Sequence, residues 1–257
     1  MNKSAKEPFS IKKSTGLKKE GHQVDYKATQ YVSKEELAPV SNPKEMLREI
    51  ISSLPKDSDW SKQFDSLDGI RRLIKNHEEF YSQIHQNLPT IMPEVLKLVE
   101  SLRSSVSKNA MMTLAEMCEA FKKQMDPFLE SIFVKLIRKG QDTNTFIVEE
   151  VNKCIKSLCR YCSSQKICSI VISNSQAKAV PIKLKISLCI RQLLEKDSFS
   201  LNLLKENPKL VGVMGSYITD SSQEVRNITR ESFLKLLENN GGNEVEGVFR
   251  KSPKDVW

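Results

Sequence analysis

The feature that most limits the fold of this chain is a repeated pattern of two apolar helical stretches separated by a short polar break. Within a stretch the apolar residues recur at the spacing of an α-helix, as in Phe64, Leu67, Ile70, Leu73 and Ile74. Strand-like alternation does not interrupt the pattern. The sequence therefore predicts an all-helical protein.

The pattern occurs about five times, at a spacing of roughly 35–45 residues, which is typical of HEAT and armadillo repeats. The breaks within the units fall at 55–60, 102–107, 140–145, 174–185 and 219–226. One unit alone cannot bury its apolar face, so stacking must supply the core. We therefore expect a right-handed, armadillo-like α-solenoid of HEAT-like helix-loop-helix repeats. All of its intra-repeat loops would emerge on one edge.

Three regions follow from the same pattern. Residues 1–40 carry many lysines and only isolated apolar residues, so they are predicted to form a basic, extended arm. Residues 41–240 form the repeat domain, which opens with Asn42 as helix cap and Pro43 as first helical residue. Residues 241–257 form a tail whose Phe249 and Trp257 could cover the last repeat. The basic residues singled out in the arm are Lys12, Lys13, Lys18 and Lys19.

The net charge of +8 favours an anionic partner, either nucleic acid, anionic lipid or an acidic protein surface. Charge alone does not choose among them. No apolar run is long enough to span a bilayer, and the first residues do not lead into a hydrophobic stretch. We therefore expect a soluble intracellular protein with reduced cysteines.

The cysteines invite a metal-site hypothesis, because Cys159 and Cys162 have the C-x2-C spacing and Cys154 and Cys168 lie nearby. A structural zinc site needs a second paired knuckle, which the sequence lacks. Cys154, Leu158 and Cys162 are instead spaced like a buried helical stripe. None of the three histidines sits near a nucleophile motif, and no glycine-rich phosphate loop is present. The sequence predicts no enzyme, metal or cofactor.

Several motifs, in order, resemble the TOG domains of the CLASP and crescerin branch. The segment from Asp59 to Arg71 resembles the opening of such a domain, and 102–110 with 113–117 resembles its second repeat. The segments 140–147 and 220–226 resemble the third and the last intra-repeat loops. The resemblance covers about residues 42–240, and its details are similar to the crescerins, the TOG array regulators of axonemal microtubules.

This resemblance implies a non-enzymatic protein that binds αβ-tubulin or the microtubule lattice with the intra-repeat loop edge. It implies a place in the cytoplasm and cytoskeleton, at the cilium or axoneme, with other axonemal proteins as possible partners and neither nucleic acid nor membrane. It also implies a microtubule-associated component or a regulator of microtubule assembly. The positions that match the family's contact residues are Trp60, Lys62, Val106, Lys108, Asn144, Phe146, Lys183, Arg226 and Arg230.

The residues themselves leave alternatives open. Trp60 lies in a polar break, where it could anchor an interface or cap the core between two helices. Arg226 could reach a partner, or brace its own loop through a salt bridge to Glu224 or Asp220. The fourth loop contains Pro181 where the family pattern is more polar.

Two other functions also stay open. A general HEAT-repeat adaptor that uses a helical face would show the same periodicity. A basic nucleic-acid binder is the weaker alternative, because aromatic residues are not interleaved with arginine and lysine predominates in the arm.

Overall fold

The structure is a computed structural model that describes residues 31–56, 58–196 and 200–251. In this part of the chain the backbone forms helices joined by short turns, without strands. The first helix pair is α1 (Pro43–Ser53) and α2 (Trp60–Asn76), and the second joins η2 (Glu78–Phe80), α3 (Tyr81–Gln86) and α4 (Leu88–Val99) to α5 (Ser104–Phe121). After η3 (Lys122–Phe128) come α6 (Leu129–Lys139) with α7 (Thr145–Tyr161), and α8 (Ser164–Asn174) with α9 (Val180–Leu194). The last elements are α10 (Ser200–Glu206), α11 (Pro208–Ile218), α12 (Gln223–Asn240) and α13 (Gly242–Lys251).

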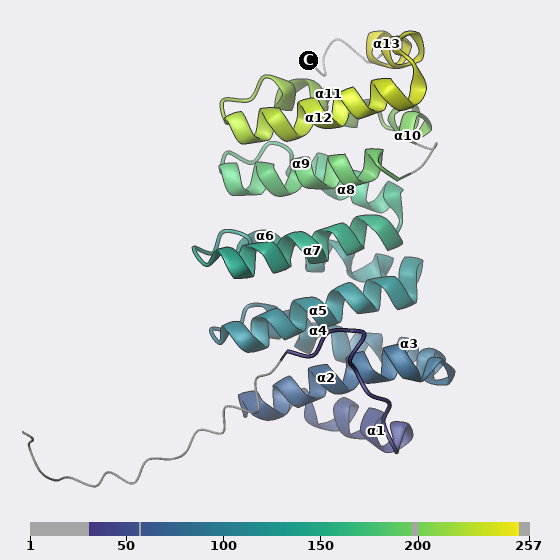
Figure 1. Cartoon of the computed structure of the whole chain (residues 1–257), viewed down its shortest axis with the longest axis vertical. Helices are drawn as coiled ribbons and strands as arrows, with labels where there is room; N and C mark the ends of the chain where they lie inside the picture. Colours follow the sequence, from purple (N-terminus) through teal and green to yellow (C-terminus); the bar gives the residue numbers. More distant parts are fainter. Residues whose placement is uncertain (1–30, 57, 197–199, 252–257) are drawn as a thin grey trace, which may run out of the picture. The chain divides into compact units, whose positions relative to one another are not determined.

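The helix pairs stack in two layers (Figure 1). The second helices α2, α5, α7, α9 and α12 pack against one another in that order. Among the first helices, α4 packs on α6, α6 on α8 and α8 on α11. Each helix buries one stripe against its own partner and another against the neighbouring pair, which is how a repeat stack builds its core. The predicted all-helical solenoid of HEAT-like repeats is confirmed.

Capping side chains fix where two second helices begin. The carboxylate of Asp59 accepts from the Ser61 N–H at 2.9 Å, and the amide oxygen of Asn144 accepts from the Phe146 N–H at 3.1 Å. Trp60 is therefore the first residue of α2, although the sequence pattern assigned it to the break. The polar break expected at 102–107 is also shorter, because α5 already begins at Ser104.

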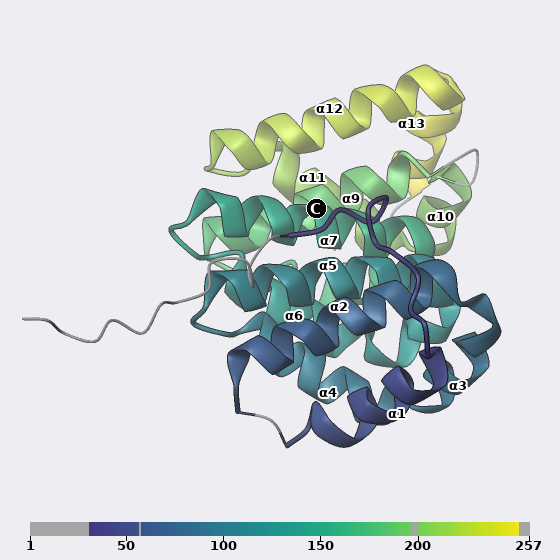
Figure 2. The ribbon, with the colours of Figure 1, turned by 60° about the horizontal axis from the view of Figure 1, so that its bottom comes forward.

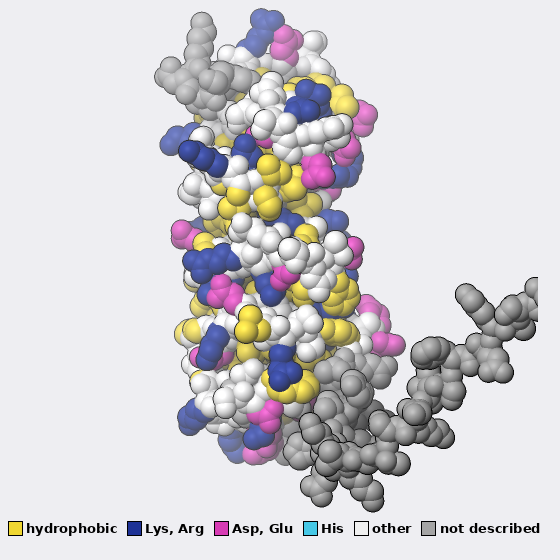
Figure 3. All heavy atoms as spheres, turned by 90° about the vertical axis from the view of Figure 1, so that its left-hand side faces the viewer, with side chains coloured by type: hydrophobic (Ala, Val, Ile, Leu, Met, Phe, Trp, Pro, Cys, Tyr) yellow, Lys and Arg dark blue, Asp and Glu magenta, His cyan; other side chains and the backbone are white. Residues whose placement is uncertain are grey.

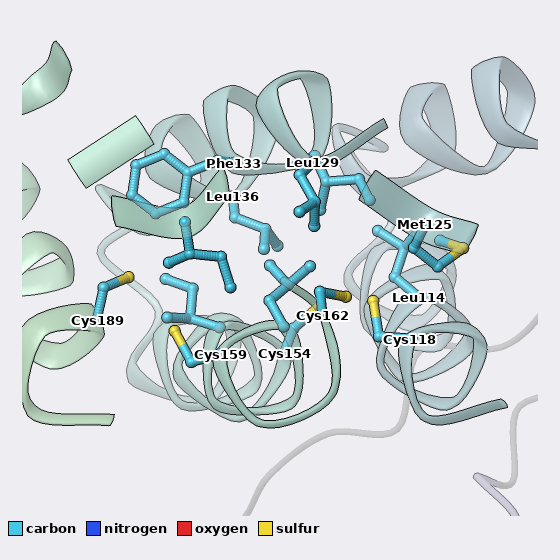
Figure 4. Close-up of a cluster of buried hydrophobic side chains, with 14 of the residues drawn as sticks. Leu114, Cys118, Met125, Leu129, Phe133, Leu136, Cys154, Cys159, Cys162 and Cys189 are labelled. Carbon is cyan, nitrogen blue, oxygen red and sulfur yellow. The ribbon is translucent and has the colours of Figure 1, made fainter. Parts of the chain in front are cut away.

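The six cysteines belong to the core, and all of them are buried (Figure 4). Cys118 of α5 lies beside Cys162 at the end of α7, and Cys159 of α7 lies beside Cys189 of α9, so each pair lies between neighbouring second helices. These contacts and burial raise the pKa of Cys118 and Cys189 well above the usual thiol value. The predicted burial of Cys154 is confirmed. Within the described residues, no three His, Cys, Asp or Glu side chains are grouped so that they could hold a metal ion.

Residues 31–40, here called the strap, run across the second helices of the first two pairs (Figures 1 and 2). Leu37 of the strap is buried, with 2 % of its surface exposed. Its backbone carbonyl accepts from Lys75 Nζ at 3.0 Å and from Asn76 Nδ2 at 3.2 Å. Lys75 also donates to the carbonyl of Glu35 at 2.5 Å. The strap is thus held by side chains of α2 that bind its carbonyl groups.

The arm was expected to reach residue 40, but the compact unit already includes Tyr31. The strap lacks a helical period, so its packing through backbone carbonyls leaves little trace in the sequence. The basic residues predicted for the arm, Lys12, Lys13, Lys18 and Lys19, lie outside the described residues.

Arg71 of α2 is fully buried beneath the strap. Its Nε and Nη2 donate to Glu116 Oε1 of α5 at 3.0 and 2.9 Å, and its Nη1 reaches Asp68 at 3.3 Å and Asn109 at 3.2 Å. Nη2 also donates to the carbonyl of Val32 at 2.8 Å. Burial raises the pKa of Glu116, while the hydrogen bond and charge of Arg71 oppose that rise. This network ties the first pair, the second pair and the strap together.

At the other end, α13 packs on the last pair. Val245 and Val248 are buried, and the ring of Phe249 lies edge-on to Phe233 with centroids 5.1 Å apart. Trp257, the other aromatic residue expected to cover this repeat, lies outside the described residues. None of the described helices combines the length and the apolar character that crossing a membrane requires.

Candidate protein-binding edge

The intra-repeat turns lie on one side of the stack, at the left of Figure 1. They join α1 to α2, α4 to α5, α6 to α7, α8 to α9, and α11 to α12. These turns, together with the first helical turns that follow them, are called the loop edge below. Most of the side chains that the sequence nominated as contact residues lie in the first turn of a second helix, and Asn144 is the residue that caps α7. Lys108 comes one turn later in α5 and Arg230 one turn later in α12.

Exposed apolar residues gather on the loop edge. Of five large hydrophobic residues exposed in the described chain, three belong to it: Leu102 is fully exposed, Phe146 is 43 % exposed and Val180 is 39 % exposed. The other two, Val134 and Leu234, lie on the bodies of α6 and α12. In Figure 3, which views the stack from the left-hand side of Figure 1, hydrophobic side chains alternate with lysine and arginine along the molecule.

Trp60 opens α2 on this edge and is half-buried. It packs against the hydrophobic core, and the guanidinium of Arg103 lies 4.7 Å from the centre of its ring. Of the two roles that the sequence left open, the structure shows the core cap, and the role as interface anchor stays a prediction. Lys62 is exposed two residues further on. Arg103, which the sequence did not nominate, joins Trp60 across the first and second pairs.

Val106 does not belong to the surface, and its expected contact role was wrong. Because α5 begins at Ser104, Val106 falls in the first helical turn and faces inward with no exposed surface. Leu102, four residues earlier in the turn, is the exposed apolar residue of this repeat. The sequence pattern assigned Leu102 only to a break between helices. A single apolar residue next to several serines does not repeat at helical spacing, so its exposure could not be predicted.

Lys108 lies between two aromatic rings. Its Nζ is 4.1 Å from the ring centre of Tyr31 in the strap and 3.9 Å from that of Phe146 in α7. The rings of Tyr31 and Phe64 are 6.2 Å apart between centroids. Burial lowers the pKa of Lys108, partly offset by the charge of Glu150. This cation is thus partly desolvated and held in one place at the loop edge.

Asn144 is exposed in the third loop, as the sequence nominated. Its side chain is occupied by capping α7, and its own N–H donates to Asp142 at 3.0 Å. These bonds fix the turn that presents Phe146. The amide is therefore chiefly a scaffold for the aromatic residue two positions later.

Lys183 is tied into the structure instead of projecting from the fourth loop. It lies in the first turn of α9, with its side chain 19 % exposed, and pairs with Asp220 of the fifth loop at 2.5 Å. Pro181 is the second residue of the same helix, where its missing N–H is not needed. Val180, just before it, is the exposed apolar residue of this repeat.

Arg226 braces the fifth loop through hydrogen bonds to backbone carbonyl groups, and not through the salt bridge that the sequence suggested. Its Nη1 donates to the carbonyl oxygens of Asp220 at 2.6 Å and Ser221 at 2.8 Å. The expected alternative, a salt bridge to Glu224 or the Asp220 carboxylate, is replaced by these backbone contacts. Arg230 is exposed one turn later, and its Nε donates to a carbonyl at the end of α11 at 3.2 Å.

The chain is thus a helical repeat protein with three of its five exposed large apolar side chains, and several cations, on one edge of the described residues. Comparison with known proteins identifies the family. Residues 44–244 match the family described as CLASP N terminal, so the chain belongs to this family. The resemblance read from the sequence motifs is confirmed.

A mouse relative, TOG array regulator of axonemal microtubules protein 1, is 28 % identical over 210 residues, which are 79 % of this chain and 11 % of the relative. The chain thus spans about a tenth of that relative's length. Two solved structures share the fold. One, from work titled "Structural Basis of Microtubule Plus End Tracking by XMAP215, CLIP-170 and EB1", has a TM-score of 0.63 at 16 % identity, covering 86 % of this chain and 90 % of its own. The other, from "Crescerin uses a TOG domain array to regulate microtubules in the primary cilium", has a TM-score of 0.56 at 19 % identity, covering 88 % and 86 %.

Proposed function

We propose that the chain binds tubulin, as the free αβ-dimer or in the microtubule lattice, through the loop edge. The observation that carries this proposal is the gathering of Leu102, Phe146 and Val180 on one edge of the stack. The partner is inferred from the relatives, whose names and titles refer to axonemal microtubules, plus-end tracking and microtubule regulation in the cilium.

The edge has the composition of an interface with a few strong anchors. Trp60 and Phe146 are aromatic, and aromatic residues with arginine dominate binding energy at protein interfaces. Arg103 lies against the ring of Trp60 and Lys108 against that of Phe146, so a positive charge lies beside each ring. Cations placed around apolar anchors speed association with an acidic surface and lose strength as salt rises. The arm's lysines would add weak, salt-sensitive attraction to the same kind of surface.

The test replaces Trp60, Leu102 and Phe146 by alanine, singly and together, and measures binding to purified tubulin. Each single change should weaken binding by roughly 5–30-fold, because truncating an interface anchor costs on the order of 1–2 kcal/mol. The matched control replaces Val134 and Leu234, which are also apolar and exposed but lie off the edge. That pair should leave the affinity within about twofold.

The same variants separate tubulin binding at the loop edge from a general adaptor role on a helical face. Loss of binding in the control pair, with normal binding in the edge triple, would move the interface to the helices and contradict the proposal.

We further propose residence at a cilium or axoneme beside other axonemal proteins. A tagged chain should colocalise with axonemal microtubules, and the edge triple should abolish that pattern.

A further inference from the structure

We propose that Tyr31 of the strap is a positioning residue of the loop edge, which holds the Lys108 ammonium against Phe146 so that it can meet an acidic group of the partner. This inference rests on the proposed function, and it adds a residue that lies outside the helical repeats. Three separate segments, the strap, α5 and α7, supply the three side chains.

The geometry is that of a cation held between two ring faces. The Nζ of Lys108 lies 4.1 Å from one ring centre and 3.9 Å from the other, and the two rings are 6.2 Å apart between centroids. Tyr31 also contacts Phe64 of α2, again at 6.2 Å. A ring in this position is wedged between the first and third pairs. Removing it would leave Lys108 with one aromatic neighbour and more freedom.

The strap gives Tyr31 a fixed position. The next residue, Val32, accepts a hydrogen bond at 2.8 Å from the buried guanidinium of Arg71. Further along, Lys34 pairs with Glu119 of α5 at 2.5 Å. The backbone beside Tyr31 is therefore anchored to α2 and α5, so the ring is placed by the fold.

Charge around Lys108 leaves it available for an outside acid. Within the described residues Lys108 forms no ion pair, and the nearby carboxylate of Glu150 is engaged with Lys153 at 3.3 Å. Burial lowers the pKa of Lys108, so a carboxylate arriving from a partner meets a partly desolvated cation. Because the side chain is already ordered, binding loses less conformational entropy than it would with a mobile lysine.

The experiment is a double-mutant cycle on tubulin affinity with Tyr31→Ala, Lys108→Ala and the pair. Tyr31→Ala should weaken binding about fivefold in the native background and by less than twofold when Lys108 is already alanine. Tyr31→Phe keeps the ring and should stay within twofold of the native affinity. In an Arg226→Ala background, which lies far along the edge, the effect of Tyr31→Ala should remain fivefold.

A second readout separates positioning from loss of fold. The pKa of Lys108, followed by NMR in free protein, should rise toward the usual lysine value in Tyr31→Ala and stay lowered in Tyr31→Phe. Equal effects of Tyr31→Ala with and without Lys108, or an unchanged Lys108 pKa, would overturn the proposal. If the triple of Trp60, Leu102 and Phe146 leaves tubulin binding intact, the proposed function fails, while the NMR result still decides whether Tyr31 places Lys108.

Discussion

The first two helix pairs are joined by a buried ion network around Arg71, whereas in the last two pairs an ion pair and hydrogen bonds brace the loop edge itself. Arg71 is buried between α2 and α5, and the edge in front of it carries exposed Leu102 and Phe146. In the last pairs Lys183 and Arg226 are occupied with Asp220 and its neighbour in the turn. The edge of the first three pairs therefore carries the aromatic candidate anchors, while the edge of the last two pairs carries Val180 beside cations that already have internal partners.

This difference changes how the family's contact positions are understood here. The resemblance gave the same role to residues in all five repeats. The structure separates three pairs whose edge carries the aromatic residues from two pairs whose edge carries Val180 and cations with internal partners. Affinity should therefore concentrate at the first three pairs, while the last two hold their loops in shape.

The largest expected effect comes from removing the buried cation. Arg71→Leu leaves Glu116 and Asp68 without their partner, so the free energy of unfolding should fall by about 3–5 kcal/mol. The control is Arg191→Leu, whose pairs with Glu195 and Glu231 are more exposed, and it should cost at most about 1 kcal/mol. Urea unfolding measures both. If the two variants lost similar amounts of stability, the buried network around Arg71 would contribute no more than an exposed ion pair, which contradicts the prediction.

A smaller contrast separates two apolar residues of the second repeat. Val106→Ala should cost roughly 2 kcal/mol of stability, since it removes fully buried methyl groups and leaves a cavity. Leu102→Ala should change stability by less than about 0.5 kcal/mol, because that side chain is exposed. Tubulin affinity should show the reverse order. Thermal unfolding and a binding titration on the same two variants measure the two effects. If Val106→Ala bound tubulin more weakly than Leu102→Ala, the assignment of Leu102 as the surface residue of this repeat would be wrong.

The smallest effect concerns the brace of the last two pairs and depends on pH. Burial would raise the pKa of Asp220, but hydrogen bonds from Lys183 and the Ser222 N–H, with the charge of Lys183, hold it below the usual aspartate value. A lowered folded pKa stabilises the protein above the unfolded pKa, and this stabilisation is lost as pH falls through the folded value. Asp220→Asn should therefore cost about 1 kcal/mol at neutral pH. The gap from the native protein should close below about pH 4.

Periodicity alone predicted the helical stack, because each second helix repeats its buried residues over several turns. It failed where contacts do not follow a period. The strap is held through carbonyl groups of residues such as Val32 and Leu37, which no side-chain pattern reveals. Val106 was misplaced because serines around it looked like a loop, although they form the first turn of α5. Lys183 and Arg226 find their partners only when the fifth loop folds. Their roles inside the protein could therefore not be predicted from the sequence.

Hydrogen exchange of the chain, with and without saturating tubulin, is the sharpest test of binding through the loop edge. Such binding should slow exchange in the first turns of α2, α5 and α7 around Trp60, Leu102 and Phe146, with the bodies of α6 and α12 around Val134 and Leu234 unchanged. Protection confined to those helix bodies, with the loop edge exchanging as in the free protein, would contradict it.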